Sequence, residues 1–320
     1  MLPILGKTTG FTFQSLENPA GVSADSRYTR RMTRRILLLT ATLWLAGWTA
    51  AAEVAPLLTF AAIADIQYAD KESGKTRDYR ASPDKVRKSA ADLNPQKPAF
   101  IIHLGDLTDG QPTPELGKKD IETIAAALKS VQAPWKFVLG NHDATKTGRN
   151  FLAEVLGFKE FHYAFTAPGL AGWRFVVLDG NDGPKEYFGA QQLDWFRGVL
   201  KQAKAHNERV ICFCHFPLVR ETNQNAPPAI ALPALSILDE SGCVVAWICG
   251  HVHGGGYVLR NGVHHLTLRG TCEPKDQPAS AIVRLFPDRL SITGYGREPS
   301  RELPFAPATN AAPIALRPAA

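Results

Sequence analysis

The stretch Phe137-Val-Leu-Gly-Asn-His-Asp143 decides the fold, because an apolar run stops at Gly140 and three polar side chains follow at once. A buried strand delivers polar groups to the carboxyl edge of a sheet in this way. The same pattern recurs at four other apolar runs, which end at Asp65 and Gln67, at Asp106, at His215, and at His251 and His253. Packing alone does not explain five strands that all end in Asp, Asn, Gln or His. The pattern therefore predicts a functional site where the strand ends meet.

Outward from these runs, apolar strands alternate with segments of helical periodicity. The expected helices cover residues 82–93, 120–131, 151–156, 190–206 and 234–240, and only short strands follow residue 257. This order indicates an α/β fold with two sheets in one domain. The domain is expected to cover residues 53–302. The Ala/Pro-rich residues 303–320 have little to bury and are expected to be disordered.

The net charge of the 320-residue chain is +6, and most of it lies in residues 1–52, whose own net charge is +4. No run of Lys or Arg occurs in the remainder, which carries only +2. The electrostatic basis for nucleic-acid binding is therefore weak, and we expect no nucleic-acid partner.

An export signal is expected at residues 32–52. Basic residues up to Arg35 precede an apolar run from Ile36 to Trp48, and small residues follow it. The run is shorter than the roughly 20 residues of a membrane span, so no stable membrane insertion is expected after cleavage. The pair Arg34-Arg35 is typical of the twin-arginine route. Residues 1–31 are expected to form an extension before the signal, and they show no helical or strand periodicity. We expect a periplasmic or secreted protein.

Seven strand-end side chains offer only oxygen or imidazole ligands: Asp65, Gln67, Asp106, Asn141, His215, His251 and His253. Without a thiolate, such a set suits hard or borderline divalent metals. It exceeds the three or four protein ligands of one zinc ion. Two metals that share one carboxylate would use the whole set, bind a phosphoryl oxygen, and turn a bridging water into a hydroxide nucleophile at neutral pH.

Five motifs resemble, in order and spacing, those of the calcineurin-like metallophosphoesterases. They are Asp65-x-Gln67, Gly105-Asp106-x-x-Asp109, Gly140-Asn141-His142-Asp143, His215 and Gly250-His251-x-His253, within residues 58–296. The resemblance implies the fold of that family, a two-sheet β-sandwich flanked by helices. It also implies a first metal on Asp65 and His253, a bridging Asp106, and a second metal on Asn141, His215 and His251. His142 would protonate the leaving group, with Asp143 orienting it.

Gln67 departs from most of that family, which has His at this position. An amide oxygen is harder than imidazole and favours Mn²⁺ or Mg²⁺ over Zn²⁺. The segments Asp65-Ile-Gln-Tyr-Ala-Asp70 and Arg77-Asp-Tyr-Arg80 resemble the manganese-dependent ADP-ribose/CDP-alcohol diphosphatases, whose third motif often ends in Glu rather than in Asp143. The resemblance implies two divalent metal ions, with Mn²⁺ favoured and Fe, Mg or Zn as alternatives.

Several of these residues keep a second interpretation. Gln67 as a neutral amide would hydrogen-bond a neighbouring ligand instead of a metal, and His142 would be a structural imidazole. Arg77 and Arg80 would clamp a second phosphate of the substrate, or remain solvated loop charges. His103 lies within a strand and is expected in the core.

These observations predict an exported two-metal hydrolase that acts on a small-molecule phosphate. The favoured substrate is a nucleoside diphosphate derivative cut at its pyrophosphate, such as ADP-ribose or a CDP-alcohol. The alternatives are a broad-range phosphomonoesterase or phosphodiesterase, and a metal-binding protein on the same fold without turnover.

Overall fold

The computed structural model describes residues 54–144, 149–157, 159–183, 187–220, 222, 228–273 and 277–305. The expected upstream extension (1–31), the expected signal peptide (32–52) and residues 306–320 of the expected tail lie outside the described residues. From Ala55 onward the described chain belongs to one compact unit. A search of the described residues finds no helix that is long and apolar enough to span a membrane.

The first sheet has six strands in the order β12-β11-β10-β1-β2-β3. Their bounds are β1 Leu58–Ile63, β2 Ile101–His103, β3 Trp135–Phe137, β10 Ala279–Leu285, β11 Arg289–Gly296 and β12 Arg301–Pro304. Strands β1, β2 and β3 run parallel to one another. Strand β1 also pairs antiparallel with β10, and β10, β11 and β12 continue as an antiparallel set. The central strand β1 is therefore hydrogen-bonded on both edges.

The second sheet also has six strands, in the order β4-β5-β6-β7-β9-β8. Their bounds are β4 Tyr163–Phe165, β5 Trp173–Val177, β6 Arg209–Phe213, β7 Val244–Cys249, β8 Gly256–Arg260 and β9 Val263–Thr267. Strands β5, β6, β7 and β9 are parallel, while β4 and β8 close the two edges antiparallel. The parallel segment of each sheet thus brings several carboxyl strand ends to one edge.

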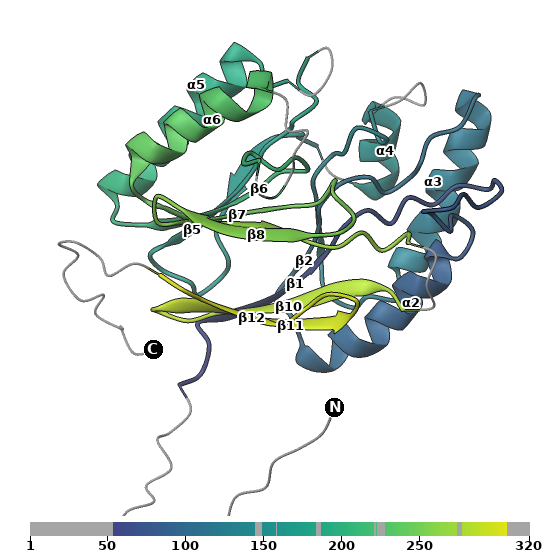
Figure 1. Ribbon diagram of the computed structural model, residues 1–320, viewed down its shortest axis with the longest axis horizontal. Coiled ribbons are helices and arrows are strands. Elements are labelled where there is room, and N and C mark those ends of the chain that lie inside the picture. Colours follow the sequence, from purple (N-terminus) through teal and green to yellow (C-terminus); the bar gives the residue numbers. More distant parts are fainter. Residues whose placement is uncertain are drawn as a thin grey trace, which may run out of the picture. The chain divides into compact units, whose positions relative to one another are not determined.

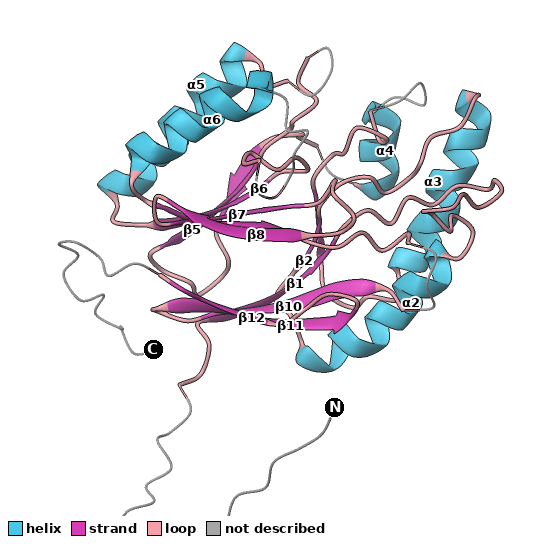
Figure 2. Cartoon of the chain, viewed as in Figure 1, coloured by secondary structure: helices cyan, strands magenta, loops and turns pink. Residues whose placement is uncertain are grey.

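The two sheets pack face to face, and helices cover both outer faces (Figures 1 and 2). Helices α2 (Ser82–Leu93), α3 (Pro114–Leu128) and α4 (Arg149–Leu156) lie on the first sheet. Helices α5 (Ala190–Ala205) and α6 (Pro228–Ser241) lie on the second. A 3₁₀ turn, η1 (Asn94–Gln96), follows α2. The expected α/β fold, a two-sheet sandwich flanked by helices, is confirmed.

Strand β1 shows how the sequence builds these layers. Phe60 and Ala62 face the core between the sheets, whereas Ala61 and Ile63 face the helices α2 and α3. Side chains of a strand alternate between its two faces, and β1 is covered on both. A near-continuous apolar run is the pattern that a strand buried on both faces requires.

Three expected boundaries were wrong. Helix α3 begins at Pro114 instead of residue 120, because the side chain of Thr113 accepts a hydrogen bond from the Leu116 N–H and caps it. Helix α6 begins at Pro228 and contains Pro233, which we expected to precede it. Strand β12 extends the ordered chain past residue 302, because Leu303 is buried and pairs with Leu290.

Candidate metal centre

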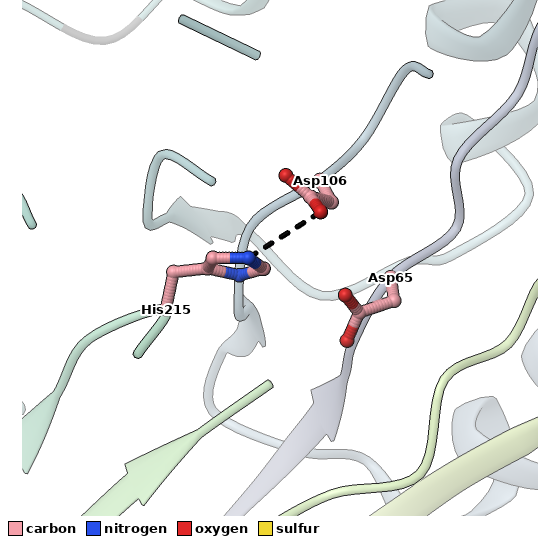
Figure 3. Close-up of side chains that lie close together, drawn as sticks. All are labelled: Asp65, Asp106 and His215. Atoms are coloured by element: carbon pink, nitrogen blue, oxygen red, sulfur yellow. Dashed lines mark ion pairs between the residues drawn. The ribbon is translucent and has the colours of Figure 1, made fainter. Parts of the chain in front are cut away.

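The seven expected metal ligands lie just beyond the carboxyl ends of β1, β2, β3, β6 and β7. The oxygen ligands come from the first sheet: Asp65 and Gln67 follow β1, Asp106 follows β2, and Asn141 follows β3. The imidazoles come from the second sheet, with His215 after β6 and with His251 and His253 after β7. Figure 3 shows Asp65, Asp106 and His215 turned toward one another, with ligand atoms that all lie within 4.8 Å. The two sheets therefore supply different ligand types to one centre.

The protonation of His215 can be assigned from its contacts. Its Nδ1 lies 2.8 Å from the carbonyl oxygen of Leu104, which can only accept, so Nδ1 carries the hydrogen. In the neutral ring, Nε2 then carries no hydrogen and offers a lone pair. It lies 3.1 Å from Asn141 Oδ1 and 3.3 Å from Asp106 Oδ2, which are also acceptors. Acceptors that converge in this way need a cation between them, either a proton on the imidazole or a metal ion.

The side chain of His251 lies beside the expected second metal position. Its Nδ1 lies 3.1 Å from Asn141 Oδ1 and 3.3 Å from His215 Nε2. Asn141, His215 and His251 thus contact one another, and Asp106 contacts His215, so one carboxylate, one amide oxygen and two imidazoles are linked side by side. This donor set fits a divalent metal of the hard or borderline class.

The first metal position lies between Asp65 and His253, whose Oδ1 and Nε2 atoms are 3.5 Å apart. His253 Nδ1 lies 3.1 Å from the Glu273 carboxylate. A carboxylate behind the ring fixes the tautomer that leaves Nε2 free to bind a metal. The Asp65 carboxylate also accepts the main-chain N–H of His251, at 3.0 Å from Oδ2. Asp65 therefore ties the ends of β1 and β7 together at the centre.

Gln67 contacts the other residues of the centre through both atoms of its side-chain amide. Its Nε2 donates to Asp106 Oδ2 at 3.0 Å, and its Oε1 accepts from the Cys272 thiol at 3.1 Å. This is the arrangement of the second interpretation, in which the amide holds a neighbouring ligand. Metal binding through Oε1 requires a half-turn of the amide, which exchanges the two atoms. The role of Gln67 as a ligand stays a prediction.

Backbone conformation at the centre is strained. Asp65, Gln67, Asp106 and His251 all have φ between 44° and 72°, the left-handed region that side chains with a Cβ disfavour. They make up four of the seven non-glycine residues with positive φ in the described chain. Such strain persists where surrounding structure enforces it, and it concentrates at functional sites. Here each strand turns sharply just where its ligand must point inward.

Gly140 is required where β3 enters the centre. A Cβ at this position would overlap both Oδ1 and the main-chain nitrogen of Asp106. The strand can therefore approach the Asp106 carboxylate this closely only with glycine here.

The position of His142 corrects one expectation. Its main-chain N–H donates to Asp106 Oδ1 at 2.8 Å, and its Nδ1 lies 3.1 Å from Asp109 Oδ1. Asp109, not Asp143, holds the imidazole. The Asp143 carboxylate instead accepts four main-chain N–H groups, from Gly140 and from residues 106–108, at 2.7 to 3.2 Å. Asp143 was expected to orient His142; it shapes the loop that carries Asp106, because its oxygens are used up by that backbone.

These contacts bring the residues that are expected to bind metal together beside the His142 imidazole, which Asp109 holds. A model of the family described as calcineurin-like phosphoesterase matches residues 58–255. The chain belongs to this family.

Two named relatives align with most of the phosphoesterase. The manganese-dependent ADP-ribose/CDP-alcohol diphosphatases of Mus musculus and Homo sapiens are 28% and 27% identical to it. Each match covers 77% of this chain, with 93% and 92% of the relatives. The crystal structure of a dimetal phosphatase from Danio rerio is similar, with a TM-score of 0.68 and 26% identity. That match covers 78% of this chain and all of the other. The phosphoesterase is therefore a hydrolase of the two-metal type.

The two arginines expected to bind substrate have different positions in the phosphoesterase. Arg80 is half-exposed and pairs with Asp70 and Glu72 at 2.8 and 2.6 Å, so it is a surface loop charge rather than a clamp. Arg77 donates to Asp109 Oδ1 at 3.0 Å, and Lys71 pairs with the other oxygen of the same carboxylate. Arg77 therefore supports the residue that holds His142.

Burial and neighbouring charge set the protonation of the imidazoles. Burial disfavours a charged His215, but the Asp106 carboxylate outweighs it and raises the pKa of His215 to about 9. Burial is likewise outweighed at His253, where the hydrogen bond to Asp65 raises the pKa to about 11. Burial and the nearby His215 lower the pKa of His251 to about 4. Two of the three imidazoles thus hold a proton where a metal would bind.

Sequence reasoning missed Cys272 and Glu273, which contact Gln67 and His253. They follow β9, whose sequence includes His264 and His265, so no continuous apolar run marks this strand end. Asp109 was part of a recognised motif but had no role assigned to it. His103 was expected in the core, and it is buried beside Phe137.

Proposed function

We propose that the phosphoesterase is an exported, manganese-dependent hydrolase that cleaves the pyrophosphate of nucleoside diphosphate derivatives such as ADP-ribose or a CDP-alcohol. The names of its relatives support the substrate class, because they match this chain over more than nine-tenths of their length. Gln67 supports manganese, since an amide near the first metal position is harder than the imidazole it replaces.

One observation carries the hydrolytic part of this proposal. Oxygen atoms of Asn141 and Asp106 lie 3.1 and 3.3 Å from His215 Nε2. The other ring nitrogen, Nδ1, donates its hydrogen to the Leu104 carbonyl. Without metal, a proton on His215 satisfies these acceptors, and a bound divalent metal would replace that proton. Asp106 also lies beside Gln67 of the first position, so its carboxylate can serve both positions.

The chain would hold the two metals through Asp65, His253, Asp106, Asn141, His215 and His251, with Gln67 beside them. When bound, a metal pair lowers the pKa of a bridging water to give hydroxide and neutralises charge on the phosphoryl group. His142 supplies the proton. Its Nδ1 is held by Asp109, so Nε2 is the atom that donates to the departing phosphate. Asp143 keeps Asp106 and Gly140 in place through the backbone.

The test is hydrolysis by the metal-stripped protein after addition of Mn²⁺, Mg²⁺ or Zn²⁺. ADP-ribose and p-nitrophenyl phosphate are offered in parallel to the wild type and to His142→Ala. We expect Mn²⁺-dependent release of AMP from ADP-ribose, and a loss of about 10²–10⁴-fold in the variant, the usual contribution of a positioned acid.

The other outcomes separate the alternatives. Hydrolysis of the nitrophenyl ester alone would identify a general phosphoesterase and reject the pyrophosphate substrate. Binding of two metals without turnover of either substrate would reject the enzymatic proposal for these compounds and favour a binding role.

A further inference from the structure

A cavity of about 440 Å³ opens directly beside the first metal position. It is lined by His253, Gly254, Arg269, Glu273 and Arg297. His253 belongs to both places, since its Nε2 faces Asp65 while the ring forms one wall of the cavity. Whatever binds in the cavity therefore lies next to a group bound at the metals.

Two arginines give this cavity its charge. Arg269 donates through Nε to the Gly254 carbonyl at 3.3 Å and through Nη1 to the Arg297 carbonyl at 2.5 Å. Arg297 donates through Nε to the Gln277 carbonyl at 3.2 Å and through Nη2 to the Gly270 carbonyl. Main-chain oxygens thus hold both guanidinium groups in place without neutralising them.

Neither guanidinium is paired with an acid in the part of the chain that the structure describes. No described carboxylate lies within ion-pair distance of Arg269 or Arg297, whereas Arg301, close by in sequence, is paired with Glu298 at 2.8 Å. Both arginines are only partly exposed. Burial lowers the pKa of Arg297 despite the nearby Glu273. Among the described residues, these two fixed, partly buried cations have no ion-paired carboxylate, although Glu298 accepts the main-chain N–H of Arg269, and such cations favour an anionic ligand.

Glu273, the one acid in the wall of the cavity, is already engaged. Its carboxylate contacts His253 Nδ1 at 3.1 Å, and its main-chain oxygen accepts from the buried Lys85 ammonium at 2.5 Å. The carboxylate therefore balances the imidazole of the metal centre. The excess charge of the cavity remains positive.

We propose that this cavity binds the second anionic group of the substrate, the phosphate of the pyrophosphate that is not attacked. This inference rests on the proposed function, because it places the attacked phosphate at the metals. Arg269 and Arg297 would bind the other phosphate through the guanidinium hydrogens that face the cavity. They take the role that the sequence suggested for Arg77 and Arg80, both of which are paired with acids.

The test compares ligands with one and two phosphates. Binding of AMP and of the α,β-methylene analogue of ADP, which resists hydrolysis, is measured by calorimetry at one fixed free Mn²⁺ concentration. The proteins are the wild type, Arg269→Gln, Arg297→Gln, and the matched Lys variants, which keep the charge. Arg289→Gln is the control, because Arg289 is a surface arginine paired with Asp288 and Glu302.

We expect the wild type to bind the analogue more tightly than AMP. Each Gln variant should lose about 10- to 100-fold in affinity for the analogue, the usual effect of losing a charged hydrogen bond, with AMP affinity unchanged. The Lys variants should recover part of the loss, and Arg289→Gln should match the wild type. Metal content and melting temperature show whether each variant is folded.

Two results would overturn the inference: equal binding of both ligands by the wild type, or equal losses for both in the Gln variants. Kinetics keep it separate from the proposed function. If the wild type hydrolyses ADP-ribose, KM for it should rise in the Gln variants while KM for p-nitrophenyl phosphate stays the same. If the wild type does not hydrolyse ADP-ribose, the proposed function fails, and the binding comparison still decides the role of the cavity.

Discussion

The imidazole of His142 is held by Asp109, with 3.1 Å between Nδ1 and Oδ1, although Asp143 is its neighbour in sequence. The Asp143 carboxylate accepts main-chain N–H groups of residues 106–108 instead of contacting the His142 ring. The two aspartates therefore have separable roles. Asp109 contacts the His142 imidazole, and Asp143 contacts the loop that carries Asp106.

Asp109→Asn should lower kcat by about 10- to 100-fold, the usual cost of removing a carboxylate behind a functional imidazole. The amide oxygen can still accept from Nδ1–H, but the amide lacks the negative charge that stabilises a protonated His142 ring, and it no longer pairs with Arg77 and Lys71. Steady-state kinetics on ADP-ribose measure the effect, with bound metal determined in parallel. A variant with wild-type kcat would show that Asp109 does not position His142.

Asp143→Ala should destabilise the fold by about 3 kcal/mol, because four buried main-chain N–H groups lose their acceptor. Asp143→Asn keeps one acceptor oxygen and should lose less. Urea unfolding monitored by fluorescence gives both values. An Ala variant of unchanged stability that loses only proton donation would restore the role first expected for Asp143.

Gly140→Ala should abolish metal binding, because the added Cβ overlaps the Asp106 carboxylate and its main-chain nitrogen. Gly198→Ala is the matched control. Gly198 lies within helix α5 with no atom near the added Cβ, so alanine there should stabilise the helix by about 0.5–1 kcal/mol. Bound manganese, measured by elemental analysis, separates the two. Full metal occupancy in Gly140→Ala would contradict the close approach of β3 to Asp106.

Metal binding by the stripped protein at pH 7 should release about two protons. The pKa of His215 is raised to about 9 and that of His253 to about 11, so both rings are protonated at pH 7 and must lose a proton to bind a metal. The pKa of His251 is lowered to about 4, so it releases none. Metal affinity should accordingly rise with pH from 7 to 9.

Calorimetry in buffers of different ionisation enthalpy counts these protons. The same heat of binding in every buffer would mean that no proton is displaced, and it would reject the protonation of both rings.

The strand ends could be predicted from the sequence because an apolar run that stops at a polar cluster is a local pattern. It located Asp65, Asp106, Asn141, His215, His251 and His253, which the structure brings together. The pairing of His142 with Asp109 depends on how two loops cross, and no local pattern encodes that crossing. Arg269 and Arg297 were missed for the same reason, because their cavity forms only where the loops after β9 and β11 meet.

The ends of helices and strands were also mispredicted where they depend on contacts distant in sequence. Pro233 looks like a helix boundary in sequence, yet it lies at the sixth position of α6, and the helix continues past it because its apolar side chains pack in the core beside α5 and the second sheet. Leu303 looks like the start of a featureless tail, yet β11 offers it an open edge to pair with. In both cases the deciding partner lies outside the local sequence.

The division of ligands between the sheets gives the aromatic layer of the sandwich a further consequence. Phe60 of β1 and Phe213 of β6 meet edge to face, with ring centroids 5.9 Å apart, and their strands lead to Asp65 and His215. The thickness of this layer sets how far the oxygen ligands stand from the imidazoles. A smaller ring would let the layers settle and shift ligand distances without touching the centre. We therefore expect a change of side-chain volume at Phe60 or Phe213 to alter the distances between the carboxylates and the imidazoles.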